Sequence, residues 1–86
     1  MKTNLFTLSG RINEIPFEKR TSDVIKTLLE LKPDFVQCDT YITLSRGAGK
    51  DKITTERKLN LTQGKQVFLD ENVREVFVNN LLVEFA

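Results

Sequence analysis

The chain has 86 residues, of which 40% are hydrophobic and 29% are charged, and its formal net charge is +1. This composition excludes an intrinsically disordered chain, because enough apolar surface is present to form a core. It also predicts a single domain over residues 1–86, since a second core could not be filled at this length.

The sequence offers little of the chemistry that enzymes and metal sites use. It has no histidine and one cysteine, Cys38, so a Cys-His nucleophile pair and a disulfide within the chain are both excluded. Its apolar runs are far shorter than the roughly 20 residues that span a bilayer, and no secretory signal precedes the first alternating segment. We therefore expect a cytoplasmic, non-enzymatic protein that uses no metal or cofactor and does not bind membranes.

The first two segments differ in their periodicity. Residues 5–15 alternate apolar and polar side chains, which predicts a half-buried strand with Gly10 at a bulge or bend. Pro16 is expected to end this strand, and residues 17–20 to form a connection. Residues 22–32 include the potential capping residue Asp23 and favour a helix, although the same residues also alternate as a strand would.

The middle of the chain predicts an antiparallel hairpin with a basic tip. Residues 35–45 and 53–61 both alternate, and the loop between them contains Gly47 and Gly49. In the first run Cys38 falls on the inward side, as a core residue, whereas Phe35 and Tyr41 fall on the outward side. A nucleotide-binding P-loop is excluded, because Leu44 and Asp51 stand where that motif needs glycine and Ser or Thr.

The last third of the chain is predicted to contain two or three short strands. Residues 62–65 read as a turn and residues 67–69 as a strand. Residues 70–78 fit either a helix capped by Asp70 or a strand, and the valines and phenylalanine favour the strand. Residues 81–85 are expected to form the final strand.

These elements predict a mainly β fold, a small five-stranded OB-like barrel with one helix over residues 22–32, because closure into a barrel removes exposed sheet edges. The alternative is an α+β fold in which an antiparallel sheet packs on one helix. Either fold could gain core by pairing with a second copy, so a homo-oligomer is also expected.

Basic side chains interleaved with outward aromatic residues indicate a protein that binds single-stranded DNA or RNA, with cations on the phosphates and rings stacked on the bases. The predicted binding residues are Arg11, Lys19, Arg20, Phe35, Tyr41, Arg46, Lys50, Lys52, Arg57 and Lys58. The alternative is a protein-protein interaction module, such as an accessory or inhibitory protein of phages or mobile elements. Its binding would depend on the acidic and apolar C-terminal part, including Glu71, Glu75 and Phe77.

Three segments resemble bacterial single-stranded-DNA-binding proteins and the related primosomal replication protein. Residues 8–12 (LSGRI) and 15–19 (IPFEK) are similar to the first strand and loop of that family, and residues 61–67 (LTQGKQV) to a turn before a late strand. The resemblance implies an OB-fold barrel with residues 41–61 as an arm over a bound single strand. The chain departs from the family by its lack of tryptophan and of an acidic tail, and by the helical pattern of residues 22–31.

Overall fold

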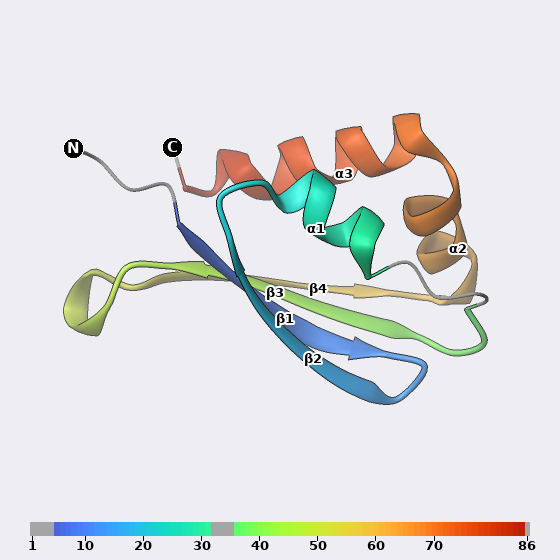
Figure 1. The fold of residues 1–86 in the computed structure, drawn as a ribbon, viewed down its shortest axis with the longest axis horizontal. Helices are drawn as coiled ribbons and strands as arrows, with labels where there is room; N and C mark the ends of the chain where they lie inside the picture. The colour runs from blue at the N-terminus through green and yellow to red at the C-terminus, as the bar shows by residue number, and fades with distance from the viewer. Residues whose placement is uncertain (1–4, 32–35, 86) are drawn as a thin grey trace.

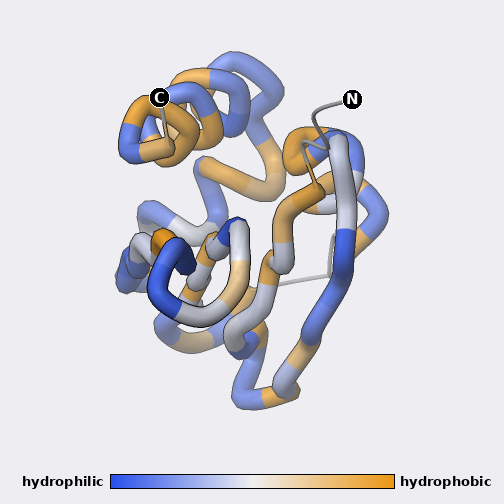
Figure 2. Tube along the Cα trace, turned by 90° about the vertical axis from the view of Figure 1, so that its left-hand side faces the viewer, coloured by the Kyte–Doolittle hydropathy of each residue, from blue (hydrophilic) through white to orange (hydrophobic). Residues whose placement is uncertain are grey.

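The computed structural model describes residues 5–31 and 36–85 and shows one antiparallel sheet with three helices on one of its faces (Figure 1). The strands lie in the order β2-β1-β3-β4, and Figure 2, turned by 90°, shows the helices as a layer above the sheet. In chain order the elements are β1 (Phe6–Ile12), β2 (Ile15–Thr21), α1 (Val24–Glu30), β3 (Thr40–Arg46), a 3₁₀ turn (Gly49–Asp51), β4 (Ile53–Leu59), α2 (Leu61–Leu69) and α3 (Glu71–Val83).

The predicted five-stranded barrel is therefore wrong. The sheet is open, with β2 and β4 as its two edges, because the segment expected to supply a closing strand is helical. The α+β alternative is correct in its antiparallel sheet, but three helices cover the sheet where one was expected.

A tight hairpin joins β1 to β2, so residues 17–20, expected to be a connection, belong to a strand, and Pro16 lies within that strand. Asn13 and Glu14 both have positive φ angles, 52° and 66°, as the two central residues of a type I′ turn require. Pro16 pairs with Arg11 on the outermost strand, where a residue that lacks an N–H group is tolerated.

Helix α1 confirms the prediction of a helix within residues 22–32. Asp23 is its N-cap, and its carboxylate accepts a hydrogen bond from the backbone N–H of Lys26 at 3.0 Å. Val24 and Leu28 are buried in the core between the helix and the sheet, whereas Leu29 is about half-exposed.

The β3–β4 hairpin confirms the antiparallel pairing predicted for the middle of the chain, with shorter strands. Ile42 and Leu44 point into the core, as predicted, and Val36 is buried just before the strand begins. Cys38 is only half-buried, which differs from its predicted core position. The predicted site residue Phe35 lies outside the described residues.

The strand and turn predictions for residues 62–69 are wrong, because this segment forms helix α2. Asn60 caps the helix through a reciprocal pair of hydrogen bonds with Gln63, a capping box that sets the first turn. Gly64, which suggested a turn, is buried, and a side chain there would press on Thr40 and Val36. Its small size allows close packing of α2 on the end of β3.

The strand favoured for residues 70–78 and the strand expected at residues 81–85 are wrong, whereas the alternative of a helix capped by Asp70 is confirmed, because α3 runs from Glu71 to Val83 with Asp70 as its N-cap. Val78 and Leu81 are buried three positions apart, as on one face of a helix. Arg74 is also buried, and its guanidinium donates to the carbonyls of Val67 and Phe68 at 3.1 and 2.9 Å. These carbonyls belong to the last turn of α2, where carbonyl groups lack donor partners within the helix, so the Arg74 guanidinium satisfies them and joins α3 to α2.

The core lies between the helix layer and the inner face of the sheet, the face that carries Leu8, Ile42 and Leu44. Among the described residues, no helix combines the length and the apolar character needed to cross a membrane.

Replacing Gly10 by alanine should cost about 2–4 kcal/mol of folding stability. Gly10 has a φ angle of 147°, and a Cβ atom there would overlap with the backbone carbonyl oxygen of Tyr41. Urea denaturation of the variant measures the loss.

The matched control is Gly49→Ala in the hairpin tip. Gly49 also has a positive φ angle, 59°, but a Cβ atom there would meet nothing within 4 Å, so only the backbone cost of about 1 kcal/mol is expected. Equal losses in the two variants would contradict the close approach of β1 and β3.

Candidate functional site

The outer face of the sheet, opposite the helices, carries one exposed aromatic side chain between two cations. Arg11 on β1, Tyr41 on β3 and Lys58 on β4 are cross-strand neighbours in the sheet register. They point outward because residues alternate along a strand, and their neighbours Ile12, Ile42 and Leu59 are buried on the inner side. We call these three residues the Tyr41 row.

The contacts within the Tyr41 row are cation–π contacts. The guanidinium carbon of Arg11 lies 5.3 Å from the centroid of the Tyr41 ring, and the Lys58 ammonium lies 5.9 Å from it. Lys58 also forms an ion pair with Asp39 at 3.4 Å. Tyr41 nevertheless keeps 40% of its surface exposed, so part of the ring is open to a ligand.

Two shallow hollows adjoin the Tyr41 row, and Arg11 and Tyr41 line both of them. The first, of about 480 Å³, lies beside the β1–β2 turn and is completed by Glu14, Gln37, Cys38, Asp39 and Leu61. The second, of about 460 Å³, lies along the β3–β4 pair and is completed by Ile42, Thr43, Glu56, Arg57 and Lys58. Each is large enough for a nucleobase and too open to enclose a whole small ligand.

Two further rows continue the outer face toward the hairpin tip. The next row runs Glu18, Ser9, Thr43 and Glu56 across the sheet, and the following one Arg20, Thr7, Ser45 and Thr54. The outer face is therefore mixed in charge, with a carboxylate row between two rows that carry cations. Glu18 and Glu56 were not identified from the sequence, because only the pairing register places both in one row of the outer face, with Glu56 beside Tyr41 and Glu18 at the opposite edge.

Two of the predicted cations lie at the tip of the hairpin. Lys50 and Lys52 are exposed on and next to the 3₁₀ turn. The tip extends well beyond the helix layer (Figure 1), so these two ammonium groups stand apart from the Tyr41 row.

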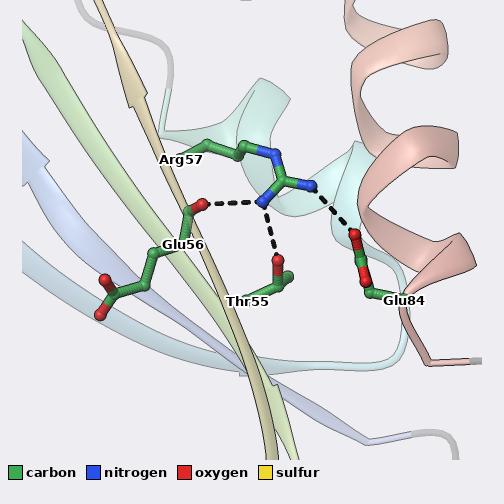
Figure 3. Close-up of polar contacts among 4 residues, drawn as sticks. All are labelled: Thr55, Glu56, Arg57 and Glu84. Atoms are coloured by element: carbon green, nitrogen blue, oxygen red, sulfur yellow. Dashed lines mark hydrogen bonds and ion pairs between the residues drawn. The ribbon is translucent and has the colours of Figure 1, made fainter.

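The remaining predicted cations, Lys19, Arg46 and Arg57, lie on the inner side of the sheet. Arg57 reaches toward α3, where it pairs with Glu84 at 3.4 Å, while its neighbour Glu56 points the other way (Figure 3). Its guanidinium also donates to the hydroxyl of Thr55 and the carbonyl of Glu56. Arg57 is thus engaged in contacts within the protein.

Arg46 is more deeply engaged than Arg57. Its guanidinium donates to the carbonyl oxygen of Phe85 at 2.6 Å and lies over the rings of Phe6 and Phe85, 5.6 Å from each centroid. Lys19 pairs with the buried Leu8 in the sheet register but is itself exposed on the edge strand. Of the predicted site residues, the structure brings together Arg11, Tyr41 and Lys58, with Arg20 two rows away.

Comparison of the chain with protein families, with curated proteins and with solved structures finds no match. The function is therefore inferred from the geometry of the outer face.

Replacing Arg46 by methionine should destabilise the fold by about 1–3 kcal/mol, because a charge-assisted hydrogen bond and two cation–π contacts are lost. Arg11→Met is the matched control, since Arg11 is exposed on the outer face, and it should cost less than about 1 kcal/mol. Chemical denaturation of both variants tests this division. A larger loss for Arg11→Met would mean that the roles of the two arginines are reversed.

Proposed function

We propose that this protein binds single-stranded nucleic acid on the outer face of its sheet, with a base stacked on Tyr41 and phosphates held by Arg11, Lys58 and Arg20. The observation that carries the proposal is the Tyr41 row itself: an aromatic ring, 40% exposed, stands between two cations on the uncovered face of a four-stranded sheet. Exposed aromatic residues on such sheets are a common platform for unpaired bases.

Stacking a base on Tyr41 requires Lys58 to leave the ring. The exposed ion pair with Asp39 contributes about 0–1 kcal/mol, and an exposed cation–π contact about 0.5–1 kcal/mol. A base stacked on an aromatic side chain contributes about 1–3 kcal/mol. The two displaced contacts together contribute about 0.5–2 kcal/mol, so a stack of about 2 kcal/mol or more offsets their loss, and the released ammonium becomes available to a phosphate. Arg11 can remain, since guanidinium planes also stack on bases.

The mixed charge of the outer face predicts a modest affinity for single-stranded nucleic acid. The cations Arg11, Arg20 and Lys58 act against Glu18 and Glu56 in the strand rows and against Glu14 and Asp39 beside the first hollow. The net charge of the chain is only +1. We expect modest binding that depends on salt, and a preference for unpaired over duplex DNA because a duplex does not offer its bases for stacking.

The Tyr41→Leu variant should bind a fluorescein-labelled single strand of about 16 nucleotides roughly 5- to 100-fold more weakly than the wild type, because the stack is lost. Fluorescence anisotropy at low salt measures the change. Tyr41→Phe keeps the ring and should bind within about 2-fold of the wild type. Equal binding by the Leu and Phe variants would show that the ring is not a stacking platform.

The Lys58→Gln variant should reduce the dependence of the binding constant on salt. Each phosphate contact on a single strand contributes a slope of about −0.7 to the plot of log K against log salt, and the variant should lose about one such contact. Lys26→Gln, on the exposed side of α1, is the charge-matched control and should leave the slope unchanged. Absence of binding at low salt would refute the proposed function.

A second candidate function is docking of a partner protein on the other side of the molecule. A mainly apolar groove of about 440 Å³ lies where α2 and α3 meet, lined by Leu59, Val67, Val73, Val76 and Phe77 with the amides of Gln63, Gln66, Asn72 and Asn80. Val76 is 60% exposed at this groove. The oligonucleotide titration separates the two candidates, because a protein that acts only through this groove would bind no single strand.

A further inference from the structure

We propose that Glu56 makes the outer face selective for bases that carry an exocyclic amino group, so that cytosine is bound in preference to thymine or uracil. This inference rests on the proposed function and goes further, because it assigns base preference to a residue that otherwise only weakens the attraction for phosphate.

The position of Glu56 beside Tyr41 comes from the register of β3 and β4. Thr43 pairs with Glu56, and Tyr41 pairs with Lys58, so the carboxylate belongs to the row directly after the ring. Side chains two positions apart on a strand are separated by about 6.6–6.8 Å, which is close to the width of a pyrimidine. All four residues line the same hollow of about 460 Å³. A base stacked on Tyr41 in this hollow would therefore direct one of its edges toward Glu56 and Thr43.

The carboxylate of Glu56 is available to such a base. Within the described part of the chain, the ion pairs join Arg57 to Glu84 and Lys58 to Asp39, and neither involves Glu56. The side chain is exposed and points away from α3 (Figure 3). In the contact between neighbours on β4, the Arg57 guanidinium donates to the backbone carbonyl of Glu56 at 2.8 Å and not to its carboxylate.

The chemistry of a carboxylate then decides which base is accepted. An ionised carboxylate only accepts hydrogen bonds, and the amino group at N4 of cytosine is a donor that suits it. Thymine and uracil present a carbonyl oxygen, O4, at the same position, and a carboxylate that faces this atom repels it. The Thr43 hydroxyl can donate or accept, so it adds a contact without opposing either base.

The chain provides a matched control in Glu18. It lies in the same cross-strand row as Glu56 but on β2, at the opposite edge of the sheet, and it does not line the hollow beside Tyr41. Replacing either glutamate by glutamine removes one negative charge from the same face. A general gain in affinity for phosphate should therefore be similar in the two variants, and only a change in base preference is specific to Glu56.

The test is a titration of labelled oligo-dC and oligo-dT, each about 16 nucleotides long, at low salt and pH near 7.5, where cytosine is unprotonated. Wild-type protein should bind oligo-dC about 5- to 20-fold more tightly than oligo-dT, the range expected of one good side-chain-to-base contact. Glu56→Gln should bring this ratio close to 1, mainly through tighter binding of oligo-dT, because the glutamine amide can donate to O4. Glu18→Gln should keep the wild-type ratio.

The outcomes separate this inference from the proposed function. If both oligonucleotides bind equally and Tyr41→Leu weakens both, the stacking site stands and the selectivity of Glu56 is refuted. A preference for oligo-dC that survives in Glu56→Gln, or that Glu18→Gln also abolishes, refutes it as well. Absence of binding to either oligonucleotide refutes the proposed function together with the inference. Circular dichroism of both variants establishes that the exposed substitutions leave the fold intact.

Discussion

The contact between β1 and β3 at Gly10 is the constraint on which the outer face depends. Gly10 lies in the middle of the sheet, paired with Phe17 on one side and Ile42 on the other, and the carbonyl of Tyr41 occupies the space that a side chain would need. Because the two strands meet there, Arg11 is held directly opposite Tyr41. The arrangement of the Tyr41 row is thus fixed by the backbone and needs no long side chain to hold it.

Cationic side chains of the β3–β4 hairpin lie on both faces of the sheet, because successive residues of a strand point in opposite directions. Arg46 and Arg57 point to the helix side and contact Phe85 and Glu84, so they join the sheet to the C-terminal end of α3. Lys58, adjacent to Arg57, points to the opposite side and contacts Tyr41. Cations of one hairpin therefore either hold the helix layer or lie on the proposed binding face, according to their parity in the strand.

The parts of the fold that were predictable from the sequence are those governed by local patterns. The alternation around Ile42 and the cap at Asp23 predicted the hairpin and α1 correctly. Helix α3 was not predictable in the same way, because the β-propensity of its valines was outweighed by burial of Val78 and Leu81 and by the contacts of Arg74 with α2. For the site, the outward position of Tyr41 followed from alternation, but Glu56 required the pairing register, which no single strand reveals.

The cluster of Phe6, Arg46 and Phe85 has a consequence for the order of folding. The rings of Phe6 and Phe85 meet edge to face at 5.4 Å, although they lie near opposite ends of the described chain. The guanidinium of Arg46, from the middle of the chain, donates a hydrogen bond to the backbone carbonyl of Phe85. During synthesis, β1 must therefore wait until α3 has left the ribosome before its contacts are complete. The cluster closes only when β1, the β3–β4 hairpin and the end of α3 are all in place, and contacts between such distant residues slow folding.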